Sequence, residues 1–350
     1  MENDRSDKII RTILGKLDRE VVPKVKRNAE RVEKIKDKVL DALPRGGPGG
    51  YSIHFIHCGS AFEGLAVKEE TDFDIVMMLG KPFESDNFTV CRDPSGFFTL
   101  QWKTHLPNKF LSDCDDFLDA ATIRRELFSL ASHGIKNLNI PNAEIKYREQ
   151  LVALTVEIQF FNGEKISIDF VPEIVFRTWG QCPDLRPLSE LPSCLRKYID
   201  TLNKNKSPIM FFSLAVPDAD KYLNSDQLFS VSFSLLEKKF LNSEVKLRDM
   251  VRMVKLKAHQ QNWKRLYKFQ SFFAKRTAVK HCDELKKKTL CEGYKAILEY
   301  LLQDVEKGFM EDYFIINLVA YTWKPEKASM FREELVRTLT EDPSEMLKLM

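Results

Sequence analysis

Three aspartates in this sequence stand where their carboxylates could bind metal ions. Asp72 and Asp74 are two positions apart in an apolar, strand-like run, so their side chains point to the same face of the strand. Asp169 lies near the middle of a second strand-like run later in the chain. Carboxylate oxygens suit Mg²⁺, with Mn²⁺ as the alternative metal, and three carboxylates on one sheet can hold two ions. One ion of such a pair activates an attacking hydroxyl, and the other stabilises a leaving pyrophosphate.

A glycine–serine turn precedes the first two aspartates. Gly59 and Ser60 follow a strand-like run over residues 52–58, and eleven residues, 61–71, separate Ser60 from Asp72. Because glycine has no side chain, the backbone N–H groups of such a turn can approach a triphosphate. A phosphate-holding turn followed by paired carboxylates is the order of parts that a nucleotidyltransferase needs. Taken singly, each of these residues could equally be an ordinary surface or strand-end position.

A predicted hairpin positions Asp169. Two strand-like runs, residues 151–160 and 165–171, are joined at Asn162 and Gly163, a pair typical of tight hairpin turns. A three-residue loop would place Asp169 opposite Glu157, and a two-residue loop would place it opposite Val156. In either register, an aspartate in the middle of an apolar strand needs a functional reason.

A long amphipathic helix is predicted over residues 6–43, because apolar residues recur there at spacings of three and four. Pro23 should kink this helix or divide it. Its most basic stretch is expected to contact nucleic acid, with a merely solubilising surface as the alternative. The residues of this stretch that we assign to nucleic-acid binding are Lys24, Lys26, Arg27, Arg31 and Lys34.

Beyond residue 180 the pattern changes from strands to helices. Pro183, Pro187 and Pro192 mark a linker, and helical periodicity then dominates. The predicted helices cover residues 231–241, 247–258, 263–279, 292–309 and 331–339. We therefore predict an α+β, bilobal fold of two domains. Residues 1–180 would form the long N-terminal spine helix and a mixed-sheet catalytic lobe, and residues 181–350 a helical lobe.

Composition and charge indicate a protein of the cytoplasm. The chain has 350 residues, 43% of them hydrophobic and 30% charged, and no apolar run approaches the roughly 20 residues that span a bilayer. The first residues are too polar for a secretory signal, and the seven cysteines include no CxxC pair, so we expect reduced thiols and no zinc site. The net charge is only +3, yet residues 252–288 hold twelve Lys or Arg against two acids. Such a concentration favours binding of polyphosphate or nucleic acid.

Several segments together resemble one family of enzymes. Residues 59–65 (GSAFEGL), which lead to the DFD run at 72–74, resemble the catalytic signature of cyclic GMP-AMP synthase-like receptors and their Mab-type relatives. Residues 231–241 are similar to the S-F-S-x-x-E-K-x-x-L helix of that family, and residues 248–255 to its basic helix. Residues 271–282 and 311–315 resemble two later motifs. The likeness covers nearly the whole chain.

The resemblance implies a role for each matching residue. The metal-binding, catalytic triad would be Asp72, Asp74 and Asp169. Nucleotide binding would fall to Gly59, Ser60, Lys255, Ser271, Phe272 and Lys275. Of these, Phe272 would stack on a base where the synthase has tyrosine, because stacking needs the ring face and not the hydroxyl. Ordinary core packing is the alternative for Phe272.

Differences between this sequence and the vertebrate synthase affect which activator and substrates we expect. Residues 242–246 are too few to build the zinc-binding insertion that clasps DNA in that enzyme, so long double-stranded RNA is expected as activator rather than DNA. The base-reading arginine of the family aligns with Ser230, which cannot supply a planar fork. The expected activity is synthesis of a cyclic dinucleotide from ATP and GTP by a sensor in innate immunity, in which two copies pair along the nucleic acid. Two alternatives stay open: a catalytically silent Mab-type scaffold or developmental protein, and a transferase that extends RNA ends.

Overall fold

Two helices, α1 (Glu2–Glu20) and α2 (Val22–Ala42), form the N-terminal spine of the molecule. The computed structural model describes residues 2–42, 52–103, 110–112, 115–136, 138–214, 216, 222 and 225–349. The predicted division of the spine is confirmed, because the chain turns at Val21 and Pro23 occupies the first turn of α2. Proline is tolerated there, since an N–H group in the first helical turn has no partner within the helix.

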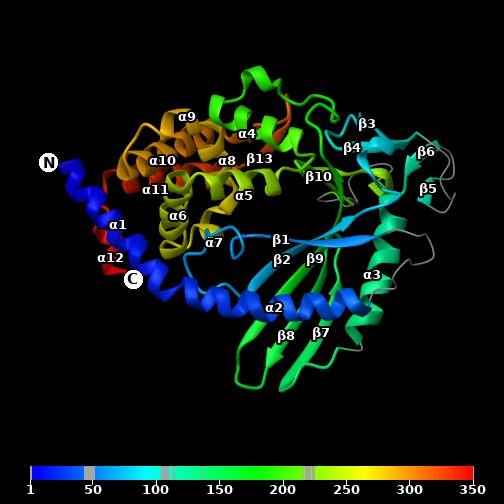
Figure 1. Cartoon of the computed structure of the whole chain (residues 1–350). Helices are drawn as coiled ribbons and strands as arrows, with labels where there is room; N and C mark the ends of the chain where they lie inside the picture. Colours follow the sequence, from blue (N-terminus) through cyan, green and yellow to red (C-terminus); the bar gives the residue numbers. More distant parts are fainter. Residues whose placement is uncertain are drawn as a thin grey trace.

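A seven-stranded mixed sheet forms the centre of the molecule (Figure 1). Its longest strand, β9, pairs in parallel with β2 and antiparallel with β8 and β10. The strands are β1 (Ile53–Cys58), β2 (Asp72–Leu79), β7 (Ala143–Glu149), β8 (Leu154–Phe160), β9 (Lys165–Phe176), β10 (Met210–Ser213) and β11 (Ser230–Ser232). Because β10 and β11 join the sheet, the sheet extends beyond residue 180, and the two-domain division of the chain stays a proposal.

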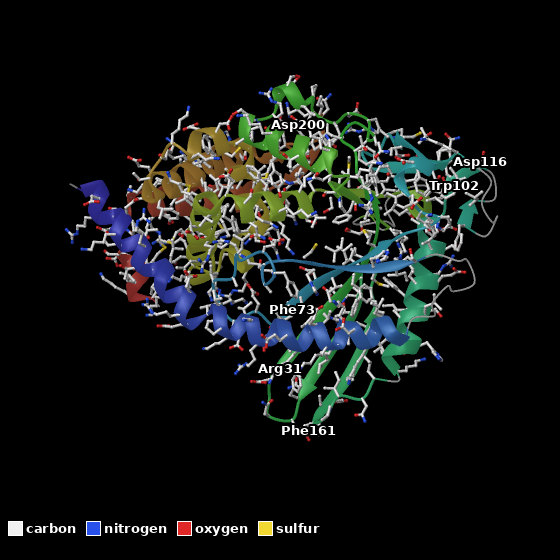
Figure 2. The ribbon with its side chains drawn as sticks, in the orientation of Figure 1. Arg31, Phe73, Trp102, Asp116, Phe161 and Asp200 are labelled. Atoms are coloured by element: carbon white, nitrogen blue, oxygen red, sulfur yellow. The ribbon has the colours of Figure 1, made fainter. Side chains whose placement is uncertain are left out.

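The two faces of this sheet have different surroundings. On one face, α2 and α3 (Ala120–Lys136) cover the alternate apolar residues of β2, β8 and β9. Phe73 lies between the sheet and α2, where its burial is nearly complete (Figure 2). The opposite face carries the aspartates of β2 and β9, together with an apolar patch that packs against Leu235. Burial of one face thus leaves the polar residues on the other.

The hairpin between β8 and β9 corrects the predicted register of Asp169. The loop has four residues, 161–164, and Asp169 pairs with Thr155, not with Glu157 or Val156. Phe160 N–H donates to Glu164 O, and Gly163 adopts a φ of +88°, so the turn takes up more residues than a two- or three-residue loop. Phe161 stands at the tip of this hairpin, 76% exposed (Figure 2).

Helices make up most of the chain after β11. They are α5 (Ser234–Ser243), α6 (Val245–Gln260), α7 (Trp263–Tyr267), α8 (Ser271–Lys280), α9 (Cys282–Leu285), α10 (Leu290–Lys307), α11 (Pro325–Thr340) and α12 (Glu345–Lys348). The single helix predicted over residues 263–279 is wrong, because Lys268 adopts a left-handed conformation that separates α7 from α8. This break places Ser271 at the first turn of α8.

The remaining elements lie around the central sheet. Helix α4 (Ser193–Lys204) follows the predicted proline-rich linker. A four-stranded sheet contains β3 (Phe88–Arg92), β4 (Phe98–Trp102), β5 (Leu111–Ser112) and β6 (Asp115–Leu118), and a two-stranded sheet contains β12 (Phe309–Glu311) and β13 (Val319–Thr322). None of the helices in the described part of the chain is long and apolar enough to span a membrane.

Candidate active site

The sheet brings the three predicted aspartates together. Asp74 on β2 and Asp169 on β9 are direct register partners, and Asp72 pairs with Ser167 one pleat away. All three side chains point to the same face, since they are separated by even numbers of residues or lie directly opposite one another. The arrangement offers hard oxygen donors on one surface, which fits a divalent ion such as Mg²⁺.

Asp74 is exposed to solvent on one side, but protein atoms surround the rest of its carboxylate. Burial by the surrounding protein raises the pKa of Asp74 to about 6, and the negative charge of Asp169 adds to this rise. Two carboxylates that repel each other in this way are stabilised when a cation is placed between them. The electrostatics of the site therefore favour a metal ion.

Thr155 is a site residue that sequence reasoning missed. Its hydroxyl donates a hydrogen bond of 2.6 Å to Asp169 Oδ1 and accepts one of 3.0 Å from Gln150 Nε2. Thr155 therefore fixes the carboxylate orientation from the neighbouring strand. Only the register of the hairpin could have shown that Thr155 lies opposite Asp169. That register depends on the length of the loop, which the sequence did not define.

Gly59 is required by the geometry of the turn. It has a φ of +80°, and a methyl group added to it would lie 2.4 Å from Asp74 Oδ2. The N–H groups of Phe62 and Glu63 both donate to Gly59 O, so the chain coils tightly after the turn. The predicted glycine–serine turn thus directly adjoins the carboxylates.

Both predicted nucleotide-binding lysines, which lie on helices of the C-terminal part of the chain, contact the turn or the residues just after it. Lys255 Nζ on α6 donates to Ser60 Oγ at 2.6 Å, and burial lowers the pKa of Lys255 to about 8. Lys275 Nζ on α8 donates to both carboxylate oxygens of Glu63, at 3.0 and 3.3 Å. Burial opposes the charge on Lys275, but Glu63 and Glu237 raise its pKa above the ordinary value.

The segment between Ser60 and Asp72 is packed against the protein. Glu63 and Leu65 are each only 1% exposed. Asn28 on α2 donates to Glu69 Oε1 and to Glu70 O, and Arg27 lies 3.6 Å from Glu69. Residues 61–71 thus form a segment docked on the rest of the protein, and the spine helix contacts this docked segment directly.

Phe272 lies beside a hollow of about 520 Å³, and Ser271 precedes it as the first residue of α8. Phe272 is half-buried and lines this hollow with Ser230, Ser232, Lys275 and Arg276. Arg276 is held by two carboxylates, Glu237 at 3.1 Å and Asp312. An aromatic ring beside serine hydroxyls and a fixed guanidinium could hold a nucleobase by stacking and hydrogen bonding.

The predicted nucleic-acid residues on α2 divide into two groups. Lys24, Lys26 and Lys34 are exposed. Arg27 and Arg31 pair with Glu164, and Arg31 also lies over the ring of Phe160, so both arginines link α2 to the hairpin. The basic concentration over residues 252–288 is likewise only partly a surface feature, because Arg252, Lys255, Lys257 and Lys275 are buried.

A model of the Mab-21 protein nucleotidyltransferase domain matches residues 61–243. The chain belongs to the Mab-21 family. This match contains Asp72, Asp74 and Asp169, and it begins directly after Ser60. The Mab-21 chain therefore has a nucleotidyltransferase domain, and its α+β fold agrees with that assignment. No curated protein matches the chain.

A second cluster of side chains that could bind a metal ion lies elsewhere in the Mab-21 chain. Ligand atoms of Cys194, Cys282 and Asp283 lie within 4.8 Å of one another. The two sulfur atoms are 2.7 Å apart, closer than about 3.8 Å for two thiolates on one tetrahedral zinc ion, and Asp283 already accepts hydrogen bonds from two N–H groups of α4. Only Glu244 separates α5 from α6, at the position where the resemblance to the synthase would place a zinc-binding insertion.

Proposed function

We propose that this Mab-21 protein joins ATP and GTP into a cyclic dinucleotide when long double-stranded RNA activates it. The observation that carries the proposal is the pairing of Asp74 with Asp169 beside the Gly59–Ser60 turn. A non-catalytic scaffold has no need to keep two repelling carboxylates together. As a cyclic dinucleotide synthase, the protein would act in the cytoplasm as a sensor in innate immunity.

The residues of the site divide the work of nucleotidyl transfer. Asp72, Asp74 and Asp169 would hold Mg²⁺, which when bound lowers the pKa of the attacking ribose hydroxyl and neutralises the leaving pyrophosphate. The backbone at Gly59 and Ser60, together with Lys255, Ser271 and Lys275, would bind the triphosphate. Phe272 would stack on a base in the 520 Å³ hollow.

Contacts between the spine and the docked segment suggest how RNA activates the enzyme. Arg27 is 54% exposed and lies 3.6 Å from Glu69. An RNA phosphate that binds Lys24, Lys26, Lys34 and the arginines would compete with Glu69 and Glu164 for these cations. Release of Glu69 would then let residues 61–71 rearrange around a nucleotide. We propose further that two copies pair along one duplex.

The proposal is tested by incubating the purified protein with labelled ATP, GTP and Mg²⁺. Parallel reactions contain no nucleic acid, long double-stranded RNA or long double-stranded DNA, and products are separated after phosphatase treatment. A phosphatase-resistant dinucleotide that requires RNA is expected, and Asp169→Asn should abolish it while RNA binding is retained. Lengthened RNA would instead indicate transfer to RNA ends, and no product in any reaction would favour a scaffold.

A further inference from the structure

Two cysteines that are far apart in the sequence meet outside the candidate active site. Cys194 lies in the first turn of α4, and Cys282 is the first residue of α9. The two helices pack side by side (Figure 1). The sulfur atoms of the two cysteines are 2.7 Å apart. A disulfide bond is about 2.0 Å long, so these atoms need to approach by less than about 1 Å to form one.

Asp283 fixes the backbone of both cysteines. It follows Cys282 directly in the chain, and its carboxylate accepts hydrogen bonds from the N–H groups of Ser193, at 2.5 Å, and Cys194, at 3.0 Å. Asp283 thus provides partners for N–H groups that would otherwise be free at the start of α4. Because one residue both adjoins Cys282 and caps the helix of Cys194, the two thiols are held together in the reduced protein.

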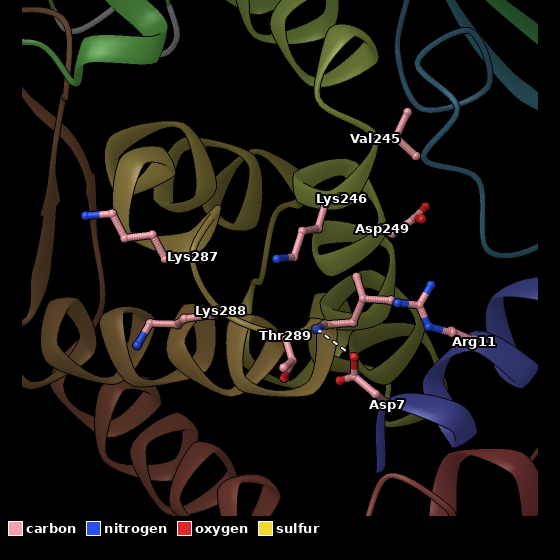
Figure 3. A pocket seen from close by; sticks show the side chains of 9 residues that line it. Asp7, Arg11, Val245, Lys246, Asp249, Lys287, Lys288 and Thr289 are labelled. Carbon is pink, nitrogen blue, oxygen red and sulfur yellow. Dashed lines mark hydrogen bonds between the residues drawn. The ribbon is translucent and has the colours of Figure 1, made fainter. Parts of the chain in front are cut away.

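The segment that follows α9 is fixed as well. Lys286 Nζ lies 2.7 Å from Glu244 Oε1, between α5 and α6. At the end of the segment, Asp7 of α1 accepts a hydrogen bond of 3.3 Å from the N–H group of Leu290, the first residue of α10 (Figure 3). Cys282 therefore cannot move away from Cys194 without the loss of several contacts.

One sulfur of the pair is accessible from outside. Cys282 is fully buried, but Cys194 is only half-buried and lines a hollow of about 660 Å³. The acids of this hollow, Glu244 and Asp283, are engaged within the fold. Its cations are exposed, and they are Lys197, Lys286 and Lys287. An anionic oxidant would be attracted to these ammonium groups and would reach Cys194 first.

We propose that Cys194 and Cys282 form a reversible disulfide bond, with glutathione disulfide as the oxidant. The Cys194 thiolate attacks one sulfur of glutathione disulfide and releases one glutathione thiolate. The Cys282 thiol then loses its proton, attacks the Cys194 sulfur of the mixed disulfide and releases the second glutathione. In total the two cysteines lose two electrons and two protons, and glutathione disulfide takes them up to become two molecules of glutathione.

The dithiol is the resting state of this pair in the cytoplasm, where we propose that the protein acts, because disulfides there are mostly transient. The hydrogen bond with Cys282 and burial both raise the pKa of Cys194, so little thiolate is present near neutral pH. Uncatalysed exchange is therefore slow, on the order of minutes to hours. The pair should respond to sustained oxidation and not to a brief pulse.

The bond would join positions 88 apart in the chain. The loop that it closes contains β10, β11 and the helices from α5 to α8. A crosslink across such a long loop restricts the unfolded chain strongly and thereby stabilises the folded protein. Oxidation should therefore raise the melting temperature by several degrees.

Thiol trapping and mass spectrometry test the inference on the full chain. The reduced protein is incubated for several hours with glutathione disulfide, its free thiols are blocked with N-ethylmaleimide under denaturing conditions, and its tryptic peptides are mapped. We expect a peptide pair that is joined through Cys194 and Cys282 and that dithiothreitol separates, together with the raised melting temperature. Cys194→Ser should lose both changes, whereas Cys91→Ser, the matched control on β3, should keep them.

Complete alkylation of both cysteines after the oxidation would overturn the inference. A stable mixed disulfide of Cys194 with glutathione, or a bond from Cys194 to a different cysteine, would also overturn it. Protection of both thiols by Zn²⁺, reversed by a chelator, would reassign the pair as a metal site. Cys194→Ser is used because Cys282 is 0% exposed, where a serine hydroxyl would be buried. Because no nucleotide product is measured, an inactive enzyme would leave this inference standing while the proposed function fails.

Discussion

Gly59 and Asp74 approach so closely that a single methyl group on the glycine would lie 2.4 Å from Asp74 Oδ2. The contact joins the Gly59–Ser60 turn, which we propose binds phosphate, to strand β2, which carries two of the proposed metal ligands. The backbone at Gly59 adds a second restriction. Its φ is +80°, an angle that residues with a side chain rarely adopt. Any residue larger than glycine at position 59 would therefore have to move either the turn or the Asp74 carboxylate.

This contact predicts the effect of Gly59→Ala. The added methyl group should displace the Asp74 carboxylate, and a displacement of about 1 Å typically costs about a hundredfold in rate. The measurement is the rate of product formation at saturating Mg²⁺. Gly163→Ala is the matched control, since Gly163 has a similar φ of +88° but nothing within 4 Å of the added methyl group. Equal activities of the two variants would contradict the proposed role of the contact.

Thr155 provides a second prediction. In Thr155→Val the hydroxyl is lost at constant volume, so Asp169 Oδ1 loses its donor on β8. Changes in such outer contacts of metal ligands typically weaken metal binding by about 10- to 100-fold. We expect the Mg²⁺ concentration for half-maximal activity to rise accordingly, while Thr155→Ser stays close to the parent protein. An unchanged Mg²⁺ dependence in Thr155→Val would show that the hydrogen bond does not orient Asp169.

The sequence predicted the placement of Asp72, Asp74 and Asp169 on one face because alternation along a strand is a local property. It did not predict the partner of Asp169, because one added loop residue shifts the register of the whole hairpin. The contact of Lys275 with Glu63 joins residues 212 positions apart. No local sequence pattern indicates such a pair. The sequence alone therefore did not show that Lys255, Lys257 and Lys275 are buried.

That buried pair leads to a prediction about stability. Glu63 and Lys275 are 1% and 7% exposed. Glu63→Gln removes one partner and leaves a buried ammonium group, which typically costs about 3–5 kcal/mol in free energy of unfolding. Glu237 remains near Lys275, so we expect a value near the lower end. Urea denaturation monitored by circular dichroism measures it.

Two further variants make the stability prediction specific. Glu63→Gln/Lys275→Met removes both charges and should recover part of the loss. Glu144→Gln breaks the exposed pair with Lys146, where the side chains are 58% and 70% exposed, and should change the free energy of unfolding by less than about 1 kcal/mol. If Glu63→Gln were no worse than Glu144→Gln, the buried pair would not stabilise the docked segment.

Glu173 predicts how stability depends on pH. It is 5% exposed on β9. Among the residues that the structure describes, its Oε2 has no hydrogen-bond partner, and neither has the hydroxyl of Ser213, which lies opposite it on β10. Burial raises the pKa of Glu173 to about 8, with a smaller contribution from Asp74. The folded protein therefore keeps this proton between about pH 5 and pH 8, where the unfolded chain has lost it.

The sign of the effect follows from this difference in bound protons. Because the folded state binds more protons, the free energy of unfolding should fall as pH rises, by about 1.4 kcal/mol per pH unit from this group alone. Glu173→Gln should remove that slope and be more stable than the parent protein near pH 8, with little difference near pH 5. Other acids such as Asp74 also titrate, so the informative quantity is the difference between variant and parent at each pH. Glu326→Gln, an exposed substitution, should leave the slope unchanged, and an equal slope in Glu173→Gln would mean that Glu173 is ionised in the folded protein.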